Sequence, residues 1–183
     1  MKKYCLMAAL LAAGLLSNAA WAQAVKTVPG VDLNRYVGKW YEIARFPNRF
    51  QKNCTGNVSA QYNRRSDGEI DVINRCKEAD GKMSEAIGRG RVDDALTNAK
   101  LKVRFAPEWL DWLSFVWADY WIIDLDAEYT AVAVGGPSRE YLWILSRTPA
   151  MPAAAYDAMV DRVTAQGFDT AKLVKTSQEQ AAK

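Results

Sequence analysis

The chain has 183 residues, of which 24 are basic, 21 are acidic and half are hydrophobic. This length and apolar content predict one globular domain with a sizeable core and exclude a disordered chain. The sequence contains no histidine, which excludes mechanisms with a histidine base, histidine-ligated haem and the common zinc sites that contain histidine. We therefore expect no metal, no cofactor and no enzymatic activity.

The first residues have the features of a secretory signal peptide. Lys2 and Lys3 precede an apolar run over residues 6–16, and small residues offer cleavage sites after Ala22 or Ala24. The run is shorter than the roughly twenty residues that span a bilayer. We expect residues 1–22 to be removed and residues 23–183 to form the mature domain, as a soluble periplasmic or secreted protein.

Export changes the charge and the cysteine chemistry. Without Lys2 and Lys3, 22 basic side chains face 21 acidic ones, so the net charge is about +1 and no basic field for nucleic acid remains. Cys5 leaves with the signal peptide. Cys54 and Cys76 reach an oxidising compartment, where we expect them to form a disulfide.

The mature chain begins with a short helical turn over residues 31–36 and a strand over 38–45. Alternating segments at 58–62 and 70–74 follow, joined by a turn at 65–68 that predicts a hairpin. A turn centred near residue 66 places Tyr62 opposite Ile70. The same register brings Cys54 and Cys76 to one face, about one diagonal step apart, which a bulge would close.

A second hairpin is predicted over residues 86–92 and 101–105. In its second strand Phe105 shares the apolar face, whereas Lys102 and Arg104 face water. Gly88 and Gly90 share a face in the first strand. Two interpretations stay open: small residues leave room for a cavity, or they only allow sharp coiling of the sheet.

Residues 106–118 are unusually aromatic for a loop and include Trp109, Trp112 and Phe115. In one interpretation these rings form an exposed lip that receives lipid or touches a membrane transiently. In the other they fold back into the end of the barrel.

The remaining elements are a hairpin over residues 120–125 and 129–135, a strand over 141–147, and a helix after Pro149 and Pro152. The helix has an apolar stripe and a C-terminal cap at Gly167. We expect it to lie on the outer wall. A short strand over 171–175 and a frayed polar tail end the chain.

Three stretches along the chain form a recognisable series: Gly38-Lys39-Trp40 with its continuation to Arg45, then Asp124–Tyr129, then Tyr141–Arg147. In this order they resemble the three sequence signatures of the lipocalin family. The first is most similar to the bacterial lipocalin and apolipoprotein D branch. The resemblance implies an all-β fold: an eight-stranded antiparallel up-and-down barrel with a C-terminal α-helix packed outside. It also implies that Trp40 packs at the closed end beneath Arg147, and that Asp126 holds the acidic signature position.

The resemblance, together with strand parity, predicts which residues point into the barrel and line a pocket. Most are large and apolar, which suits a fatty acid, a lysophospholipid or a similar hydrophobe. Glu42 shares the parity of Trp40 and needs a buried partner or a proton. The predicted ligand-binding residues are Tyr62, Val72, Asn74, Phe105, Tyr120, Trp143 and Leu145.

Two alternatives remain beside the hydrophobe carrier. One is an eight-stranded outer-membrane structural barrel, although arginine and lysine on its outer face would be costly in lipid. The other is a lipocalin-fold isomerase that uses a free thiol at Cys54. Many bacterial relatives carry a lipid on a cysteine after the apolar run, and the position of Cys5 does not fit that pattern. The sequence does not define the oligomeric state.

Overall fold

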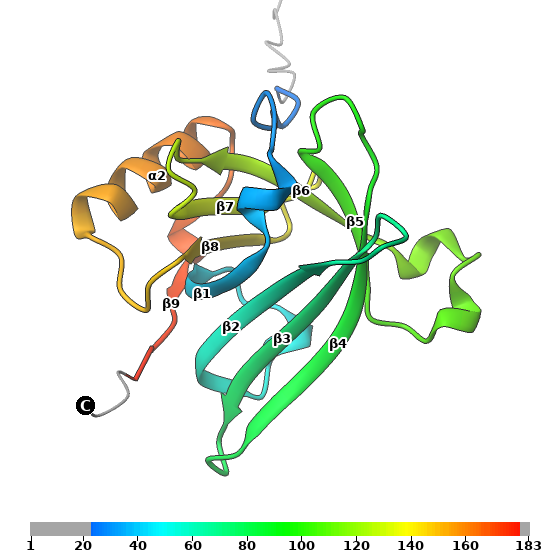
Figure 1. Ribbon diagram of the computed structural model, residues 1–183. Coiled ribbons are helices and arrows are strands. Elements are labelled where there is room, and N and C mark those ends of the chain that lie inside the picture. The colour runs from blue at the N-terminus through cyan, green and yellow to red at the C-terminus, as the bar shows by residue number, and fades with distance from the viewer. Residues whose placement is uncertain (1–22, 180–183) are drawn as a thin grey trace, which may run out of the picture.

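The computed structural model describes residues 23–179, so the predicted signal peptide lies outside the described residues. The strands form a curled sheet with one long helix beside it (Figure 1). The strands are β1 (Gly38–Arg45), β2 (Cys54–Arg64), β3 (Ile70–Glu78), β4 (Met83–Val92), β5 (Lys100–Arg104), β6 (Ala118–Leu125), β7 (Ala131–Gly135), β8 (Leu142–Ser146) and β9 (Val174–Lys175). The helices are α1 (Leu33–Tyr36) and α2 (Ala153–Ala165), and the 3-10 turns are η1 (Arg49–Gln51), η2 (Glu108–Leu110), η3 (Ser114–Val116) and η4 (Thr170–Lys172).

The strands pair in chain order from β2 to β8, and β8 then pairs with β1. Pairing of β1 with β2 closes the ring, so eight antiparallel strands form a barrel, as predicted. Closure leaves few exposed sheet edges. Strand β9 adds a two-residue pairing to β1 at one end of the barrel.

The β2–β3 hairpin corrects the predicted register. Tyr62 lies opposite Val72, and Ala60 lies opposite Asn74, which is a shift of two residues from the expected pairing. The turn lies further along the chain than expected, because the Arg65 amide donates to the Glu69 carbonyl at 2.9 Å. A shift of two leaves every side chain on its predicted face, since side chains alternate with a period of two.

The described residues form two apolar clusters, one on each side of the barrel wall. One fills the barrel and includes Trp40 and Tyr62. The other lies between the wall and α2, where Met159 and Val163 of the helix are buried. All five residues of β7 are buried, since that strand has the barrel interior on one face and α2 on the other. The helix therefore lies on the outer wall, as predicted.

Two expectations about the chain's later part were wrong. The last strand is limited to Val174–Lys175, because Thr170–Lys172 form a 3-10 turn. The tail is not frayed over residues 176–179: the Asn57 amide donates to the Ser177 carbonyl at 2.8 Å, and the Glu179 amide donates to the Asn57 side chain at 2.7 Å.

Candidate functional site

One end of the barrel is closed by an indole beneath a guanidinium. Trp40 is fully buried, and the Arg147 guanidinium lies 3.9 Å from its ring centroid. The Trp40 Nε1 donates to the Tyr36 carbonyl at 2.8 Å, which fastens the end of α1 to the barrel. Arg147 donates to main-chain carbonyls of α1, β1 and the β6–β7 turn. This residue therefore joins three segments that meet at the closed end.

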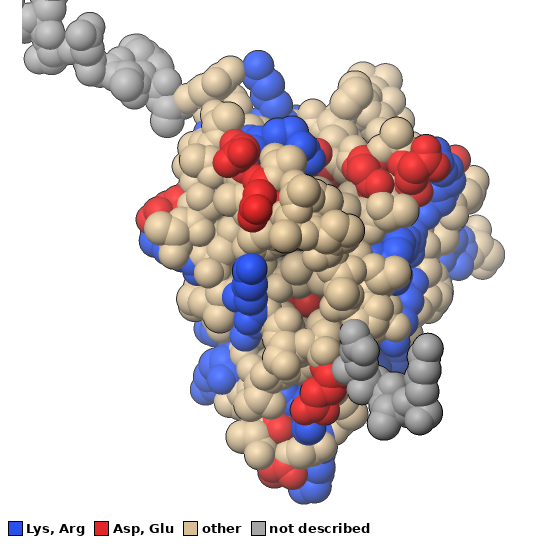
Figure 2. Space-filling model, turned by 90° about the vertical axis from the view of Figure 1, so that its left-hand side faces the viewer, with Lys and Arg blue, Asp and Glu red and all other residues tan. Residues whose placement is uncertain are grey.

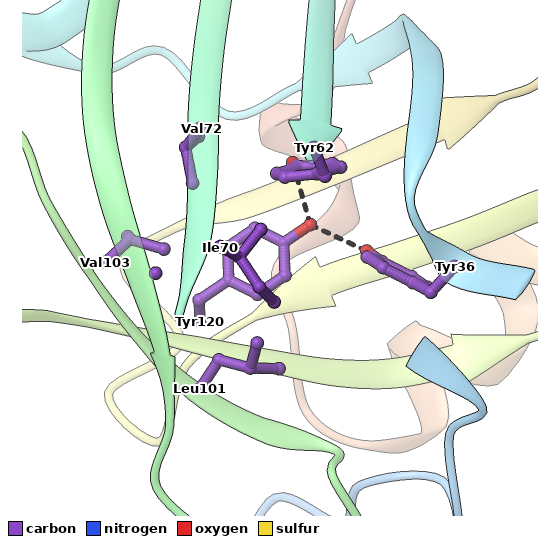
Figure 3. Close-up of a pocket in the computed structure, with 8 residues that line it drawn as sticks. Tyr36, Tyr62, Ile70, Val72, Leu101, Val103 and Tyr120 are labelled. Carbon is purple, nitrogen blue, oxygen red and sulfur yellow. Dashed lines mark hydrogen bonds between the residues drawn. The ribbon is translucent and has the colours of Figure 1, made fainter. Parts of the chain in front are cut away.

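A chain of three phenols lies just inside the closed end (Figure 3). The hydroxyls of Tyr36 and Tyr120 are 2.6 Å apart, and the Tyr120 hydroxyl donates to that of Tyr62 at 2.9 Å. Burial raises the pKa of Tyr62 to about 12 and also raises the pKa of Tyr36 and Tyr120 well above the usual range. All three side chains are therefore neutral at physiological pH.

The cavity beside these phenols is small, about 10 Å³, which is roughly the volume needed to hold one water molecule. Its wall includes Gly90, so a glycine on the predicted small-residue face does border empty space. Gly88 has a different role, because a Cβ there would lie 2.4 Å from the Arg104 carbonyl oxygen. The base of the barrel is thus nearly filled.

The other end of the barrel is open to solvent. Asn74 lies opposite Ala86, and both continue the interior face that Val72 and Gly88 occupy. Ala86 is nevertheless exposed and Asn74 is half-buried. Ala118 is also exposed, two residues before the inward-facing Tyr120. Solvent therefore reaches the interior face at this level. We call this solvent-exposed part of the interior face, around Asn74, Ala86 and Ala118, the cup.

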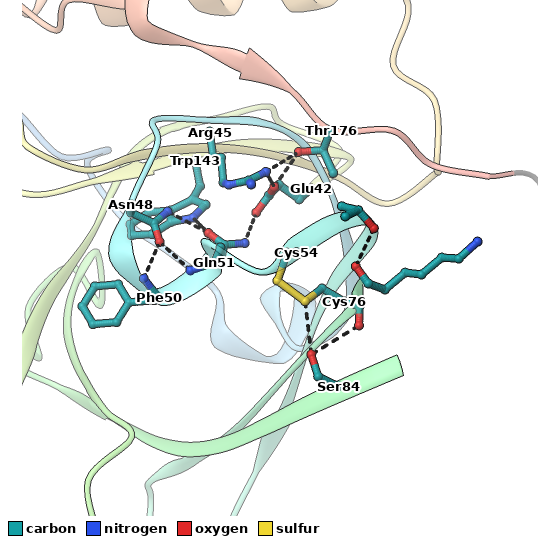
Figure 4. Close-up of a disulfide and its surroundings, with 12 residues drawn as sticks. Glu42, Arg45, Asn48, Phe50, Gln51, Cys54, Cys76, Ser84, Trp143 and Thr176 are labelled. Carbon is teal, nitrogen blue, oxygen red and sulfur yellow. Dashed lines mark hydrogen bonds and ion pairs between the residues drawn. A yellow bond between two sulfur atoms is a disulfide. The ribbon is translucent and has the colours of Figure 1, made fainter. Parts of the chain in front are cut away.

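A buried carboxylate organises the wall of this cup (Figure 4). Glu42 is only 2 % exposed, and its Oε1 lies 2.9 Å from Nη1 of Arg45. The Gln51 side-chain amide donates to Glu42 at 2.6 Å and accepts from the Trp143 indole at 2.9 Å. Thr176 also donates its hydroxyl to Glu42. Glu42 therefore has the buried partners that its inward position requires, and Gln51 fixes the orientation of Trp143.

Cys54 and Cys76 form the predicted disulfide, with Cα atoms 5.6 Å apart (Figure 4). Register shifts between Cys54 and Ser59 bring the two cysteines together. Asn57, with φ of 50°, lies within this irregular segment. The isomerase alternative needs a free thiol at Cys54, so this bond removes its main support.

The aromatic segment between β5 and β6 projects from the barrel (Figure 1). Its rings do not fold back: Trp109, Trp112 and Phe115 are 74 %, 79 % and 80 % exposed. The base of the segment is fixed by Trp117, whose ring lies 4.1 Å from the Arg91 guanidinium and whose Nε1 donates to the Asp111 carbonyl at 3.0 Å.

Arg104 does not face water as expected. It is buried under the aromatic segment, where it pairs with Asp111 and donates to the Ala106 carbonyl. The guanidinium also lies 5.2 Å from the centroid of the Trp117 ring. Arg104 and Trp117 together therefore hold both ends of the segment in place.

Charge is evenly distributed over the surface seen in Figure 2, where basic and acidic side chains lie close together. Arg91 and Lys102 lie on the outer wall of β4 and β5, and Lys102 pairs with Asp119 at 2.7 Å. Such charges on the outer wall disfavour the alternative of a lipid-embedded barrel. Among the described helices, none combines the length and apolarity required to cross a bilayer.

A family model described as a lipocalin-like domain matches residues 31–178, which is most of the chain. The chain belongs to the lipocalin family. Outer membrane lipoprotein Blc of Escherichia coli K12 is 38 % identical over 177 residues, covering 94 % of this chain and 96 % of the relative. Temperature-induced lipocalin-1 of Arabidopsis thaliana is 40 % identical over 156 residues, covering 84 % and 83 %. Mouse (Mus musculus) apolipoprotein D is 31 % identical, covering 80 % and 77 %.

Solved structures of lower sequence identity share the fold. Insecticyanin from the tobacco hornworm Manduca sexta is similar with a TM-score of 0.68 at 17 % identity, covering 87 % of each chain. Apocrustacyanin C1 gives a TM-score of 0.64 at 16 % identity, covering 82 % of this chain and 81 % of the other.

The second signature of this lipocalin lies at the β6–β7 turn. Its Asp126 carboxylate accepts hydrogen bonds from the Thr130 and Ala131 amides, each at 2.7 Å, and so shapes the turn.

Most predicted pocket residues of this lipocalin lie on the interior face. They comprise Tyr62, Val72, Asn74, Tyr120, Trp143 and Leu145. Phe105 follows the end of β5 and is 44 % exposed, and its ring packs against Gly88 of the same interior face. Sequence reasoning missed Tyr36 and Gln51. The N-cap at Asp32 could have predicted the helical turn that positions Tyr36. No local sequence feature indicates the role of Gln51.

Proposed function

We propose that this lipocalin is an exported carrier that holds one hydrophobic ligand with an acyl chain, such as a fatty acid or a lysophospholipid, in the cup of its barrel. The observation that carries this proposal is the open interior face at the mouth above a nearly filled base. Apolar walls supply affinity through burial, and a few polar tips orient the ligand. Asn74 and the Trp143–Gln51 pair are the polar groups nearest the cup.

The chemistry of the cup favours binding over catalysis. The two cysteines of the domain are joined in a disulfide, and the Glu42 carboxylate is already bound by Arg45, Gln51 and Thr176. The relatives named above are a temperature-induced lipocalin, an outer membrane lipoprotein and an apolipoprotein. We assign the same general class of activity to this chain, namely binding of a hydrophobe without turnover.

The test is titration of the delipidated mature protein with a fluorescent fatty acid. Wild type is expected to show saturable binding at about one ligand per chain. Trp143→Ala is expected to weaken the affinity about tenfold or more, because it removes a large aromatic wall from the cup. Trp112→Ala is the matched control, since that ring lies outside the barrel and its loss leaves the affinity unchanged. Absence of saturation with wild type would refute the carrier.

A second part of the proposal concerns the exposed segment of residues 106–117. Trp109, Trp112 and Phe115 are large and mostly exposed, which is typical of a surface that inserts into the lipid interface. We assign them transient contact with a bilayer, from which the cup takes its ligand. A net charge of about +1 implies that this contact depends little on anionic lipid.

Sedimentation with phosphatidylcholine vesicles tests the membrane contact. Trp112→Ala is expected to reduce the bound fraction several-fold, since each aromatic ring contributes apolar area at the interface. Trp143→Ala is expected to leave it unchanged, which reverses the roles that the two variants have in the ligand titration. Equal sedimentation of both variants and wild type would contradict the assignment.

Export of a soluble form is the third part. The signal peptide predicted over residues 1–22 supports it, and the name of the Escherichia coli relative, an outer membrane lipoprotein, supplies the opposing expectation. Mass spectrometry of protein from an expressing bacterium distinguishes them. Osmotic-shock release of a chain that begins at Gln23 or Val25, without added lipid mass, is expected. A lipid adduct or a detergent requirement would overturn it.

A further inference from the structure

The barrel wall divides where β1 and β2 separate. These strands pair from Gly38 opposite Tyr62 to Tyr41 opposite Ser59. Beyond that point β1 continues to pair with β8 on one side, but its other edge turns to β9, where Ala44 lies opposite Lys175. The start of β2, over Cys54–Val58, therefore lacks β1 as a neighbour at the mouth end.

Residues Val174–Glu179, which we call the strap, fill this fork. The Thr176 amide donates to the Ile43 carbonyl of β1 at 2.9 Å, and the Ser177 carbonyl accepts from the Asn57 amide of β2 at 2.8 Å. The Gln178 side-chain amide donates to both strands, to the Glu42 carbonyl at 2.8 Å and the Val58 carbonyl at 2.7 Å. The strap thus takes the place of direct β1–β2 pairing.

The strand β2 is shaped to receive the strap. A Cβ at Gly56 would lie 2.8 Å from the Ser177 carbonyl oxygen, so only glycine permits this approach. The backbone of Gly56 lies outside the left-handed region, so close contact and not φ explains the residue. At the outer end, the Lys77 ammonium pairs with the Glu179 carboxylate at 2.9 Å.

The strap has less regular strand pairing than the rest of the wall. Only two of its residues are in strand conformation, whereas β1 to β8 each have five or more, and Val174 is half exposed. Segments with few paired strand residues open at lower free energy than the central strands of a sheet. Two strands separated by one missing strand lie roughly 10 Å apart, twice the usual spacing, which leaves space for an extended hydrocarbon chain. Opening of the strap therefore exposes a slit in the wall.

We propose that the fork between β1 and β2 is a side entrance to the barrel, which the strap closes and which admits the acyl chain when the strap detaches. The entrance leads to the cup, because Thr176 of the strap and Gln51 of η1 both bind the Glu42 carboxylate. This inference rests on the proposed carriage of an acyl ligand. It adds the route of entry and assigns Gly56 and Gln178 as the residues that control it.

The test uses the full mature chain with two variants. Gly56→Ala places a methyl against the Ser177 carbonyl, and Gln178→Ala removes the donor shared by the two strands. Gly30→Ala is the matched control, since a Cβ there meets no atom within 4 Å. Association and dissociation of a fluorescent fatty acid are followed by stopped flow. Hydrogen exchange at the Asn57 amide reports strap detachment independently of ligand.

Both variants are expected to exchange faster at Asn57, and both rate constants for the fatty acid are expected to rise together about tenfold, with the Kd changed by less than about threefold. A gate changes the barrier and not the end states, which is why the two rates move in parallel. Gly30→Ala should match wild type in every measurement.

Three results would overturn parts of this account, and they are distinguishable. Wild type that fails to bind the fatty acid refutes the proposed function itself. Wild type that binds, with variants that exchange faster at Asn57 but show unchanged rates, refutes the side entrance. Unchanged exchange at Asn57 in both variants also refutes it, because the strap would then not depend on the contacts assigned to it.

Discussion

Replacement of Arg147 by methionine tests whether the closed end depends on this one guanidinium. Methionine keeps much of the apolar stem over Trp40 but removes the charge and every hydrogen-bond donor. Those donors reach the carbonyls of Arg35 at 2.6 Å, Tyr36 and Lys39 at 3.0 Å, and Tyr129 at 3.2 Å. The cation–π contact with Trp40, at 3.9 Å, is also lost.

The expected cost is about 3–4 kcal/mol in free energy of unfolding. A hydrogen bond from a charged donor contributes about 1.5–3 kcal/mol when buried, and a partly wet cation–π contact about 1 kcal/mol. The sum is discounted because Arg147 is partly exposed, and water replaces some donors after substitution. For a domain of this size, such a loss lowers Tm by roughly 10 °C.

Urea unfolding monitored by tryptophan fluorescence and circular dichroism measures this change. Arg64→Met is the matched control: Arg64 is exposed and makes one side-chain hydrogen bond, to Asn34, so its loss is expected to cost less than about 0.5 kcal/mol. Arg147→Lys, which keeps the charge without the planar fork, should fall between the two. A cost for Arg147→Met no greater than that of the control would refute the reasoning.

Three further predictions concern the interior and the loops. Burial raises the pKa of Tyr62 from about 10 in the unfolded chain to about 12 in the folded chain. The protonated phenol therefore contributes about 3 kcal/mol to the stability of the fold below pH 10, and this contribution is lost as the pH rises through about 12. Urea midpoints at pH 9 and 11.5 should therefore differ less in Tyr62→Phe than in wild type, and equal differences would argue against it. Joint replacement of Cys54 and Cys76 by serine, which opens a loop of sequence separation 22, should lower the free energy of unfolding by about 3 kcal/mol, and an unchanged urea midpoint would exclude a stabilising role. Trp117→Ala should speed chymotryptic cleavage within residues 106–116, because the ring held by Arg91 and Arg104 anchors that segment; an unchanged cleavage rate would show another anchor.

Local signals predicted the elements whose structure depends on local chemistry. The first strand has the expected bounds of Gly38–Arg45, since its aromatic and β-branched residues favour an extended backbone. The helix begins directly after Pro152, whose fixed φ suits the start of a helix, and Gly167 takes the positive φ of a C-terminal cap. These positions are determined by residues within a few places in the sequence.

Faces of strands were predicted more reliably than registers. The β2–β3 pairing was wrong by two residues, yet Tyr62 and Val72 still point inward, because a shift of two preserves the alternation. Local pattern does not distinguish turns of slightly different length. The bulge expected near the cysteines is present, as irregular pairing between Cys54 and Ser59, but local pattern did not predict the strap that packs against Gly56.

Long-range polar contacts were beyond the reach of the sequence pattern. Gln51 lies in a loop, yet it joins Glu42 to Trp143, which is 92 residues away in the chain. Gln178 reaches Glu42 across 136 residues. Such contacts have no periodicity, and the same residue types are common on solvated surfaces. Arg104 was misplaced for a related reason: it was expected to face water but is buried by a tertiary contact with Asp111.

Closure of the ring by strands from opposite ends of the polypeptide affects how the molecule assembles. Strand β1 must wait for β8 and for residues near position 176 before its edges are satisfied. The ribosome must therefore synthesise the chain to about residue 176 before the first strand can find its final neighbours, and such distant pairing is slow. The delay keeps the nascent polypeptide unfolded, a state that fits the export proposed above.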